Sequence, residues 1–117
     1  SLPRLRDIWF KIGTIERAHS YYLVSVPDPR LENKVVLIIQ KDLLNNDKVK
    51  PENYQLNAAM KQSLGEYQNQ VLPFEKVRNV YVIDSIPRTD LGKVQEKVLL
   101  QMIEKGAVYE IREHKME

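Results

Sequence analysis

Apolar residues recur at helical spacing at the start of the chain and mark one face of a short helix. We expect this helix to run from about Pro3 to Ile12, because proline suits a first helical turn and Gly13 suits the position after a helix ends. The apolar positions that predict it are Leu5, Ile8, Trp9 and Ile12.

Two runs of β-branched and aromatic residues follow and predict two strands. The first run, Tyr21–Val26, meets Pro27-Asp28-Pro29, and we expect the strand to stop there because proline cannot donate a hydrogen bond to a sheet. The second run, Lys34–Gln40, is almost wholly apolar, which is typical of a strand buried on both faces. The short link between the runs predicts an antiparallel hairpin.

The second half of the chain predicts a longer helix, a third strand and a third helix. The longer helix should end at Leu72-Pro73-Phe74, and its apolar stripe is Leu56, Met60, Leu64, Tyr67 and Val71. The third strand is expected at Val77–Asp84. An edge strand is a further expectation around Ala107–Ile111. The residues expected to face inward from the third helix are Val94, Val98, Leu99 and Met102.

These elements predict an α+β fold in which helices flank a small sheet of at least three strands, in the order α-β-β-α-β-α. The length of 117 residues and the hydrophobic content of 43% suit one domain with one core, so residues 1–117 are expected to form a single unit. Large side chains on the helical faces, such as Trp9, Met60 and Tyr67, are expected in that core rather than at a ligand.

Composition and charge argue against several kinds of site. The chain has no cysteine, so disulfides, thiolate metal sites and a cysteine nucleophile are excluded. The two histidines, His19 and His114, lie far apart without metal-ligand spacing, and we expect no metal site. The net charge is +2 and the two signs are interspersed, which does not predict a nucleic-acid partner. No apolar run approaches the roughly 20 residues that span a bilayer, so no membrane partner and a cytoplasmic location are expected.

The turn before the third helix carries the strongest candidate chemistry. Thr89 or Asp90 is placed to cap that helix, and Gly92 permits a backbone with positive φ. Lys93 then falls in the first helical turn, where a cation is disfavoured by the helix dipole but where amide groups and a lysine together attract an anion. On local chemistry alone an ordinary surface lysine is the simpler interpretation, because Gly92-Lys93 lacks the spacing of a P-loop.

A longer pattern around this turn changes that interpretation. The stretch LPFEKVRNVYVIDSIPRTDLGKVQEKVLL contains a strand followed by a lysine motif of the form [LI]-P-[RK]-T-x-x-G-K-[IV]-x-[R]-x-x-L. The matching positions are Ile86, Pro87, Arg88, Thr89, Gly92, Lys93, Val94 and Leu99. Upstream, Val26-Pro27-Asp28 matches the centre of a hairpin motif in the same order. From Tyr21 to Gln101 the chain therefore resembles the end of the adenylate-forming superfamily, which includes acyl- and aryl-CoA ligases, luciferases and peptide-synthetase adenylation domains.

The resemblance implies a two-step reaction. A carboxylic acid and Mg·ATP give an acyl-adenylate and pyrophosphate, and a thiol, commonly coenzyme A, then displaces AMP. Lys93 would be the catalytic residue of the first step, and the supporting turn would consist of Pro87, Arg88, Thr89 and Gly92. The implied cofactors are ATP, Mg²⁺ and coenzyme A, all acting in the full-length enzyme rather than binding to this part alone.

The resemblance also implies that residues 1–117 are a C-terminal lid domain, inactive alone, which lacks the hinge and the large N-terminal adenylation domain of the same chain. That domain and a small carboxylic acid are the implied partners. The segment VSVPDPRLENKVVLIIQ is similar to o-succinylbenzoate–CoA ligases of menaquinone biosynthesis.

The sequence departs from the family pattern at several positions. Glu32 and Asn33 stand where Gly-Glu is usual, Val77 stands where proline is usual, and Glu96 replaces a frequent arginine. Residues 1–14 contain no counterpart of the family's hinge. Two alternatives therefore stay open. One is a noncatalytic interaction domain of the same fold, and the other is an independent nucleotide-binding module, which the missing glycine-rich loop disfavours.

Overall fold

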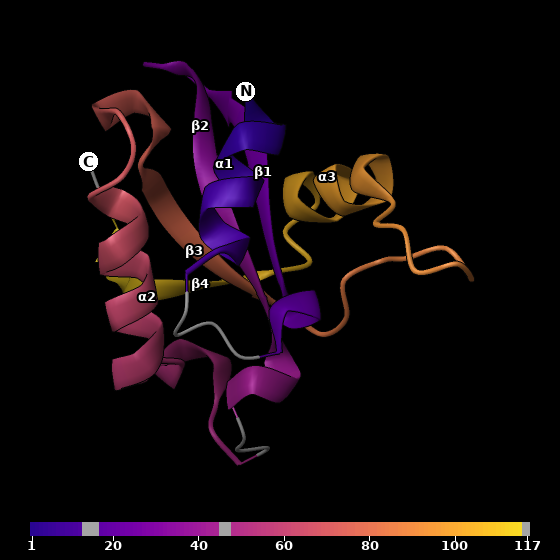
Figure 1. Cartoon of the computed structure of the whole chain (residues 1–117). Coiled ribbons are helices and arrows are strands. Elements are labelled where there is room, and N and C mark those ends of the chain that lie inside the picture. The colour runs from indigo at the N-terminus through magenta and orange to yellow at the C-terminus, as the bar shows by residue number, and fades with distance from the viewer. Residues whose placement is uncertain (13–16, 45–47, 116–117) are drawn as a thin grey trace.

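The centre of the molecule is a mixed four-stranded sheet in the order β1-β2-β3-β4 (Figure 1). The computed structural model describes the backbone of residues 1–12, 17–44 and 48–115, and side chains as far as residue 112. The strands are β1 (Tyr21–Asp28), β2 (Glu32–Gln40), β3 (Val77–Ile83) and β4 (Tyr109–Lys115). The pairs β1–β2 and β3–β4 are antiparallel, whereas β2 and β3 run parallel. The expected hairpin and the edge strand near residue 110 are confirmed.

Three helices flank the sheet, which confirms the α+β class. They are α1 (Leu2–Phe10), α2 (Ala58–Gln68) and α3 (Glu96–Glu104). Short 3-10 turns connect the elements, and they are η1 (Ala18–Ser20), η2 (Lys41–Leu44), η3 (Pro51–Asn53) and η4 (Pro73–Glu75). The segment that contains α2 connects the parallel strands β2 and β3, as parallel pairing requires a crossover.

Strand β2 separates two apolar clusters because its side chains alternate between the two faces of the sheet. Val35, Leu37 and Ile39 pack in a cluster with residues of α1 and α2. Val36 and Ile38 pack on the opposite face with Leu99 of α3. Figure 1 shows α3 standing apart from α1 and α2, as this division requires. The Lys93 segment, which precedes α3, is thereby placed on the α3 side.

The side chain of Trp9 lies at the centre of the cluster that includes α1 and α2. It is fully buried, and its ring centroid lies 5.3 Å from that of Tyr21 and 6.0 Å from that of Tyr67. Met60 is buried in the same cluster. The prediction that these large side chains belong to the core is confirmed.

Two expected element boundaries are wrong. Strand β1 continues through Pro27 to Asp28, because β1 is an edge strand with a single neighbour, and proline is tolerated at an edge. Helix α2 is shorter than its apolar stripe, since Leu56 precedes it and Val71 follows it. Both residues still pack on the same cluster. The Asn57 side chain accepts a hydrogen bond from the Met60 amide at 2.8 Å and starts the helix.

Two further expectations concern single residues. Val98, expected to face inward from α3, is 40% exposed, because the side of α3 that packs on the sheet is the one that carries Leu99 and Met102. Helix α1 ends at Phe10, and Ile12 is buried just beyond it. The predicted cap Gly13 lies outside the described residues.

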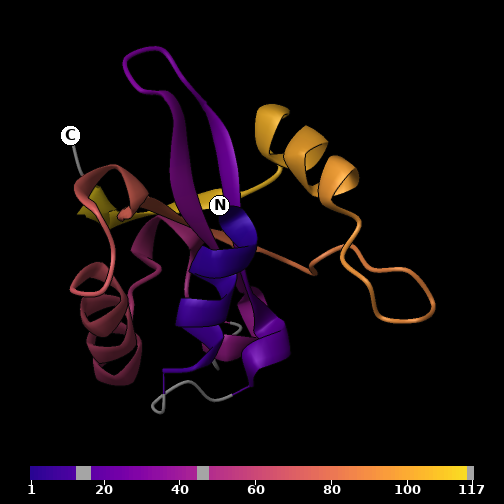
Figure 2. The ribbon, with the colours of Figure 1, turned by 45° about the horizontal axis from the view of Figure 1, so that its top comes forward.

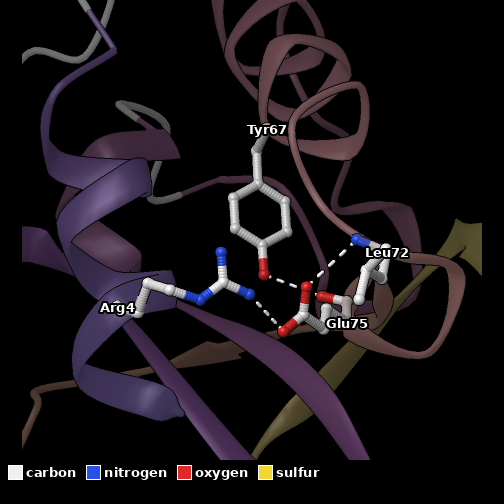
Figure 3. A network of polar contacts seen from close by, with 4 residues as sticks. All are labelled: Arg4, Tyr67, Leu72 and Glu75. Atoms are coloured by element: carbon white, nitrogen blue, oxygen red, sulfur yellow. Dashed lines mark hydrogen bonds and ion pairs between the residues drawn. The ribbon is translucent and has the colours of Figure 1, made fainter.

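A polar network fixes α1 against the turn that follows α2 (Figure 3). Arg4 forms an ion pair with Glu75, whose side chain is only 8% exposed. The other carboxylate oxygen of Glu75 accepts a hydrogen bond from the Leu72 amide at 3.0 Å. The Tyr67 hydroxyl donates to the Glu75 backbone carbonyl at 2.7 Å. The Arg4 hydrogen bond, followed by that of the Leu72 amide, holds the pKa of Glu75 below its ordinary value.

Replacing Glu75 by glutamine should therefore destabilise the domain in a pH-dependent way. A depressed pKa means that the carboxylate contributes stability above its unfolded pKa of about 4.3, and that this contribution is lost as the pH falls through the folded value. We expect Glu75→Gln to lower the free energy of unfolding by about 1–3 kcal/mol at pH 7. The difference from wild type should shrink as the pH falls below about 4.3. Urea unfolding followed by circular dichroism at several pH values measures both, and a pH-independent difference would contradict the assignment.

Candidate functional site

Lys93 lies in a hairpin-like loop between β3 and α3, and not in the first turn of a helix as its sequence position predicts. Helix α3 begins only at Glu96. The loop stem is closed by hydrogen bonds from the Thr89 amide to the Lys93 carbonyl and from the Gln95 amide to the Pro87 carbonyl, both 2.8 Å long. Because of these hydrogen bonds across the stem, residues 87–95 form a hairpin-like loop, and the helix begins after them. The expected anion site, built from a helix N-terminus and Lys93, is therefore not formed as predicted.

Thr89 and Gly92 shape the tip of this loop. The Thr89 hydroxyl accepts a hydrogen bond from the Lys93 amide at 3.2 Å, and the Thr89 carbonyl accepts one from the Gly92 amide at 2.8 Å. Gly92 has a φ of +89°, as its predicted role allows. An added Cβ at Gly92 would meet no heavy atom within 4 Å, so glycine is required for the backbone angle and not for space. Neither Thr89 nor Asp90 caps α3, whose N-cap is Gln95.

Arg88 ties the loop to the rest of the domain. Its guanidinium donates to the Gly92 carbonyl at 2.7 Å and to the His19 carbonyl in η1 at 2.8 Å. The preceding residues are anchored separately, because Ile86 is buried and its amide donates to the Gln40 side chain at 2.9 Å. Pro87 is partly buried between these two anchors. The sequence-predicted turn residues therefore lie together in one loop.

The Lys93 side chain is exposed at the end of this anchored loop. Among the residues that the structure describes, it forms no ion pair. Leu91, at the tip, is 97% exposed. Figure 2 shows the loop, drawn in orange, extending away from the sheet and helices. The arrangement can present a cation to a group outside this domain.

A hollow of about 600 Å³ lies beside the β1–β2 hairpin and α3, but Lys93 does not line it. Its lining residues are Val26, Pro27, Lys34, Tyr81, Leu100, Ile103 and Glu104. Within the described ranges no three His, Asp or Glu residues are grouped as a metal site would require. His19 is exposed, and the side chain of His114 lies outside the described part. None of the described helices is both long and apolar enough to cross a bilayer.

Sequence reasoning missed a cluster that joins α1, β1 and α3. Arg6 forms an ion pair with Glu96 and donates to the Leu23 carbonyl at 2.9 Å. The Arg6 guanidinium carbon lies 4.2 Å from the centroid of the Tyr22 ring, and the Tyr22 hydroxyl donates to Glu96 at 3.4 Å. Burial raises the pKa of Tyr22, and the charge of Arg6 partly opposes this effect. The only signal in the sequence was the acidic residue at position 96, because nothing local indicates its distant partner.

Comparison with known proteins identifies a shared fold. No family model matches the chain, and no curated protein matches it. Among solved structures, an acyl-CoA synthetase of Brucella canis is similar with a TM-score of 0.60 and 17% identity over 90% of this chain. ATP-bound MatB of Rhodopseudomonas palustris is similar with a TM-score of 0.59 and 17% identity, also over 90% of this chain. An acyl-CoA synthetase (AMP-forming)/AMP-acid ligase II-like protein of Dyadobacter fermentans is similar with a TM-score of 0.54 and 18% identity over 86% of this chain.

The chain spans only a small part of these structures. It covers 18% of the Brucella and Rhodopseudomonas chains and 25% of the Dyadobacter chain. At these identities the likeness establishes the fold. The chain therefore shares the fold of a small part of each of these solved structures.

The loop geometry predicts a local effect of removing the Thr89 hydroxyl. Thr89→Val removes the side-chain acceptor of the Lys93 amide but keeps a β-branched residue of similar shape. We expect hydrogen exchange at the Lys93 amide to accelerate by about 2- to 12-fold, the loss of one ordinary hydrogen bond. The Gln95 amide is an internal control, because its acceptor is the Pro87 carbonyl. Equal exchange rates at Lys93 in the two proteins, measured by NMR, would contradict the hydroxyl's role.

Proposed function

We propose that this chain is the C-terminal lid domain of a longer, AMP-forming carboxylate–CoA ligase, and that Lys93 acts in the formation of the acyl-adenylate. The observation that carries the proposal is the exposed Lys93 at the end of an anchored loop, on a fold shared with part of several acyl-CoA synthetases. The lysine motif from Ile86 to Leu99 supports the same conclusion.

The proposed chemistry needs a fixed positive charge. In the first half-reaction a carboxylate attacks the α-phosphorus of ATP and pyrophosphate leaves, so negative charge shifts around the α-phosphate. A lysine ammonium that reaches this group stabilises the charge without transferring a proton. In the second half-reaction a thiol attacks the acyl carbon and AMP leaves. Lys93 is not required there.

A mobile domain is a suitable carrier for such a residue. When a lid closes, it brings the charge and excludes water from an intermediate that water would hydrolyse. The Lys93 loop fits this role because it reaches outward from the domain while Arg88 anchors its stem at two carbonyls. ATP, Mg²⁺ and coenzyme A would bind with the N-terminal adenylation domain, which is the proposed partner of this surface.

The substrate belongs to the class of small carboxylic acids. A narrower proposal is o-succinylbenzoate, supported by the segment VSVPDPRLENKVVLIIQ and by similarity to the o-succinylbenzoate CoA synthetase MenE of Bacillus subtilis. That similarity has a TM-score of 0.52 at 10% identity, over 93% of this chain and 18% of the other. We propose a cytoplasmic location, which is compatible with the proposed use of ATP and coenzyme A.

Substitution of Lys93 in the longer enzyme tests the assignment. Lys93→Ala should slow acyl-adenylate formation by about 10²–10³-fold, the usual effect of removing one preorganised donor. Conversion of a supplied acyl-adenylate to the thioester should be largely unchanged. Lys97→Ala is the matched control, because Lys97 is an exposed lysine four residues away on α3. An equal loss in both half-reactions would contradict the assigned role.

The 117-residue chain alone should be catalytically inactive. It is expected to show no ATP–pyrophosphate exchange and no saturable binding of ATP, because Lys93 is exposed and does not line the hollow beside α3. Isothermal titration with Mg·ATP and an exchange assay measure the two properties. Exchange activity from the purified chain would overturn the lid assignment, and tight ATP binding would favour an independent nucleotide-binding module.

A further inference from the structure

The ion pair between Arg6 and Glu96 joins α1 to the first turn of α3, immediately after the stem of the Lys93 loop. The stem closes at the Gln95 amide, which donates to the Pro87 carbonyl, and Glu96 is the next residue. An interaction that holds Glu96 in place therefore also restrains the end of the loop that carries Lys93.

Arg6 is held in place by more than its ion pair. Its Nε donates to the Leu23 carbonyl at 2.9 Å, and its guanidinium carbon lies 4.2 Å from the Tyr22 ring centroid. Its side chain is 20% exposed. A guanidinium confined by a carbonyl and an aromatic face loses less freedom on binding a carboxylate than a flexible surface arginine. Arg6 is thus a preorganised partner for Glu96.

The apolar anchorage of helix α3 lies away from its first turn. The helix is nine residues long, Leu99 is its one fully buried residue, and Leu100, Met102 and Ile103 pack partly buried against the same cluster. Leu99 follows Glu96 by three positions, so the two side chains lie on the same side of the helix. The apolar contacts of α3 begin three residues after Glu96. The ion pair attaches the helix at the residue that follows the loop stem, and with it the end of the loop.

The opposite stem of the loop is tied to the same region of the chain. Arg88 donates to the His19 carbonyl at 2.8 Å, in the turn that precedes β1. Both stems of the Lys93 loop are therefore attached to the N-terminal part of the domain through arginine side chains.

We propose that Arg6 and Glu96 are a positioning pair that sets the direction of the Lys93 loop. The consequence for adenylation rests on the proposed function, whereas the order of the loop is a property of this chain alone. The acidic residue at position 96, where the resembled family frequently has arginine, is then explained by the cation that α1 places opposite it.

A positioning pair and an ordinary surface ion pair differ in what their loss changes. The Glu96 side chain is 41% exposed, so the pair should contribute little to global stability. If it is an ordinary surface ion pair, its loss changes neither the mobility of the loop nor the unfolding midpoint. If it positions the loop, the loop becomes more mobile while the unfolding midpoint stays nearly constant.

The chain allows a clean measurement of loop mobility. It has no cysteine, so Leu91→Cys, at a 97% exposed position of the loop tip, takes a nitroxide label at one site. In this background we expect Glu96→Gln to raise the ratio of mobile to immobile label in the electron paramagnetic resonance spectrum by about two- to fivefold. The matched control is Glu104→Gln, the same chemical change on the same helix. Glu104 forms no ion pair among the described residues, and its substitution should leave the ratio unchanged.

A double-substitution cycle decides whether the two residues act together. The Arg6→Gln/Glu96→Gln protein should show no greater label mobility than Arg6→Gln alone, because removing a second member of one pair adds nothing. Equal mobility in wild type and Glu96→Gln, or additive effects of the two substitutions, would overturn the proposal. If Glu96→Gln does not fold, a salt titration of the labelled protein that retains Arg6 and Glu96 tests the same point. Label mobility in this protein should rise between about 0.05 M and about 1 M NaCl, because salt screens the ion pair, and a constant spectrum would overturn the proposal.

Activity in the longer enzyme separates this inference from the proposed function. Glu96→Gln should lower kcat for adenylate formation more than it changes the KM for ATP, because it misplaces Lys93 without removing it. If Lys93→Ala leaves adenylation intact, the proposed function fails, and the label spectra still decide the positioning pair.

Discussion

Burial of both faces of β2 is the constraint on which the arrangement of this domain depends. Val35–Ile39 are all buried, and alternate side chains in this run belong to different apolar clusters. Helices must therefore cover both faces. Two of them, α1 and α2, share one cluster, and α3 is left to cover the other through Leu99. The Lys93 loop, which leads into α3, is consequently presented on the face opposite α2.

The hydrophobic pattern predicted the elements well because burial in this domain follows local periodicity. The run Lys34–Gln40 and the stripe from Leu56 to Val71 both point to the core. Element boundaries were predicted less well where the cause is not local. Pro27 remains within β1 because of that strand's place at the edge of the sheet, which depends on the pairing of all four strands.

The candidate site shows the same division between local and distant causes. The motif predicted which residues form the turn, and Gly92 has the positive φ that its position suggested. It did not predict the shape of the turn. Hydrogen bonds across the stem hold Lys93 outside α3, and Arg88 reaches the His19 carbonyl far away in the sequence. The pairing of Arg6 with Glu96 could not be predicted from the sequence either, because charge alone does not specify a partner in a chain with many charged residues of both signs.

Pro27 has a consequence for how this small sheet behaves in solution. An edge strand offers unpaired backbone groups to any other extended chain, which is a common route to aggregation. β1 carries one such edge, and Pro27 interrupts its row of amide donors next to the turn of the hairpin. The residue that first looked like a stop signal for the strand thus helps to keep copies of the domain from polymerising through β1.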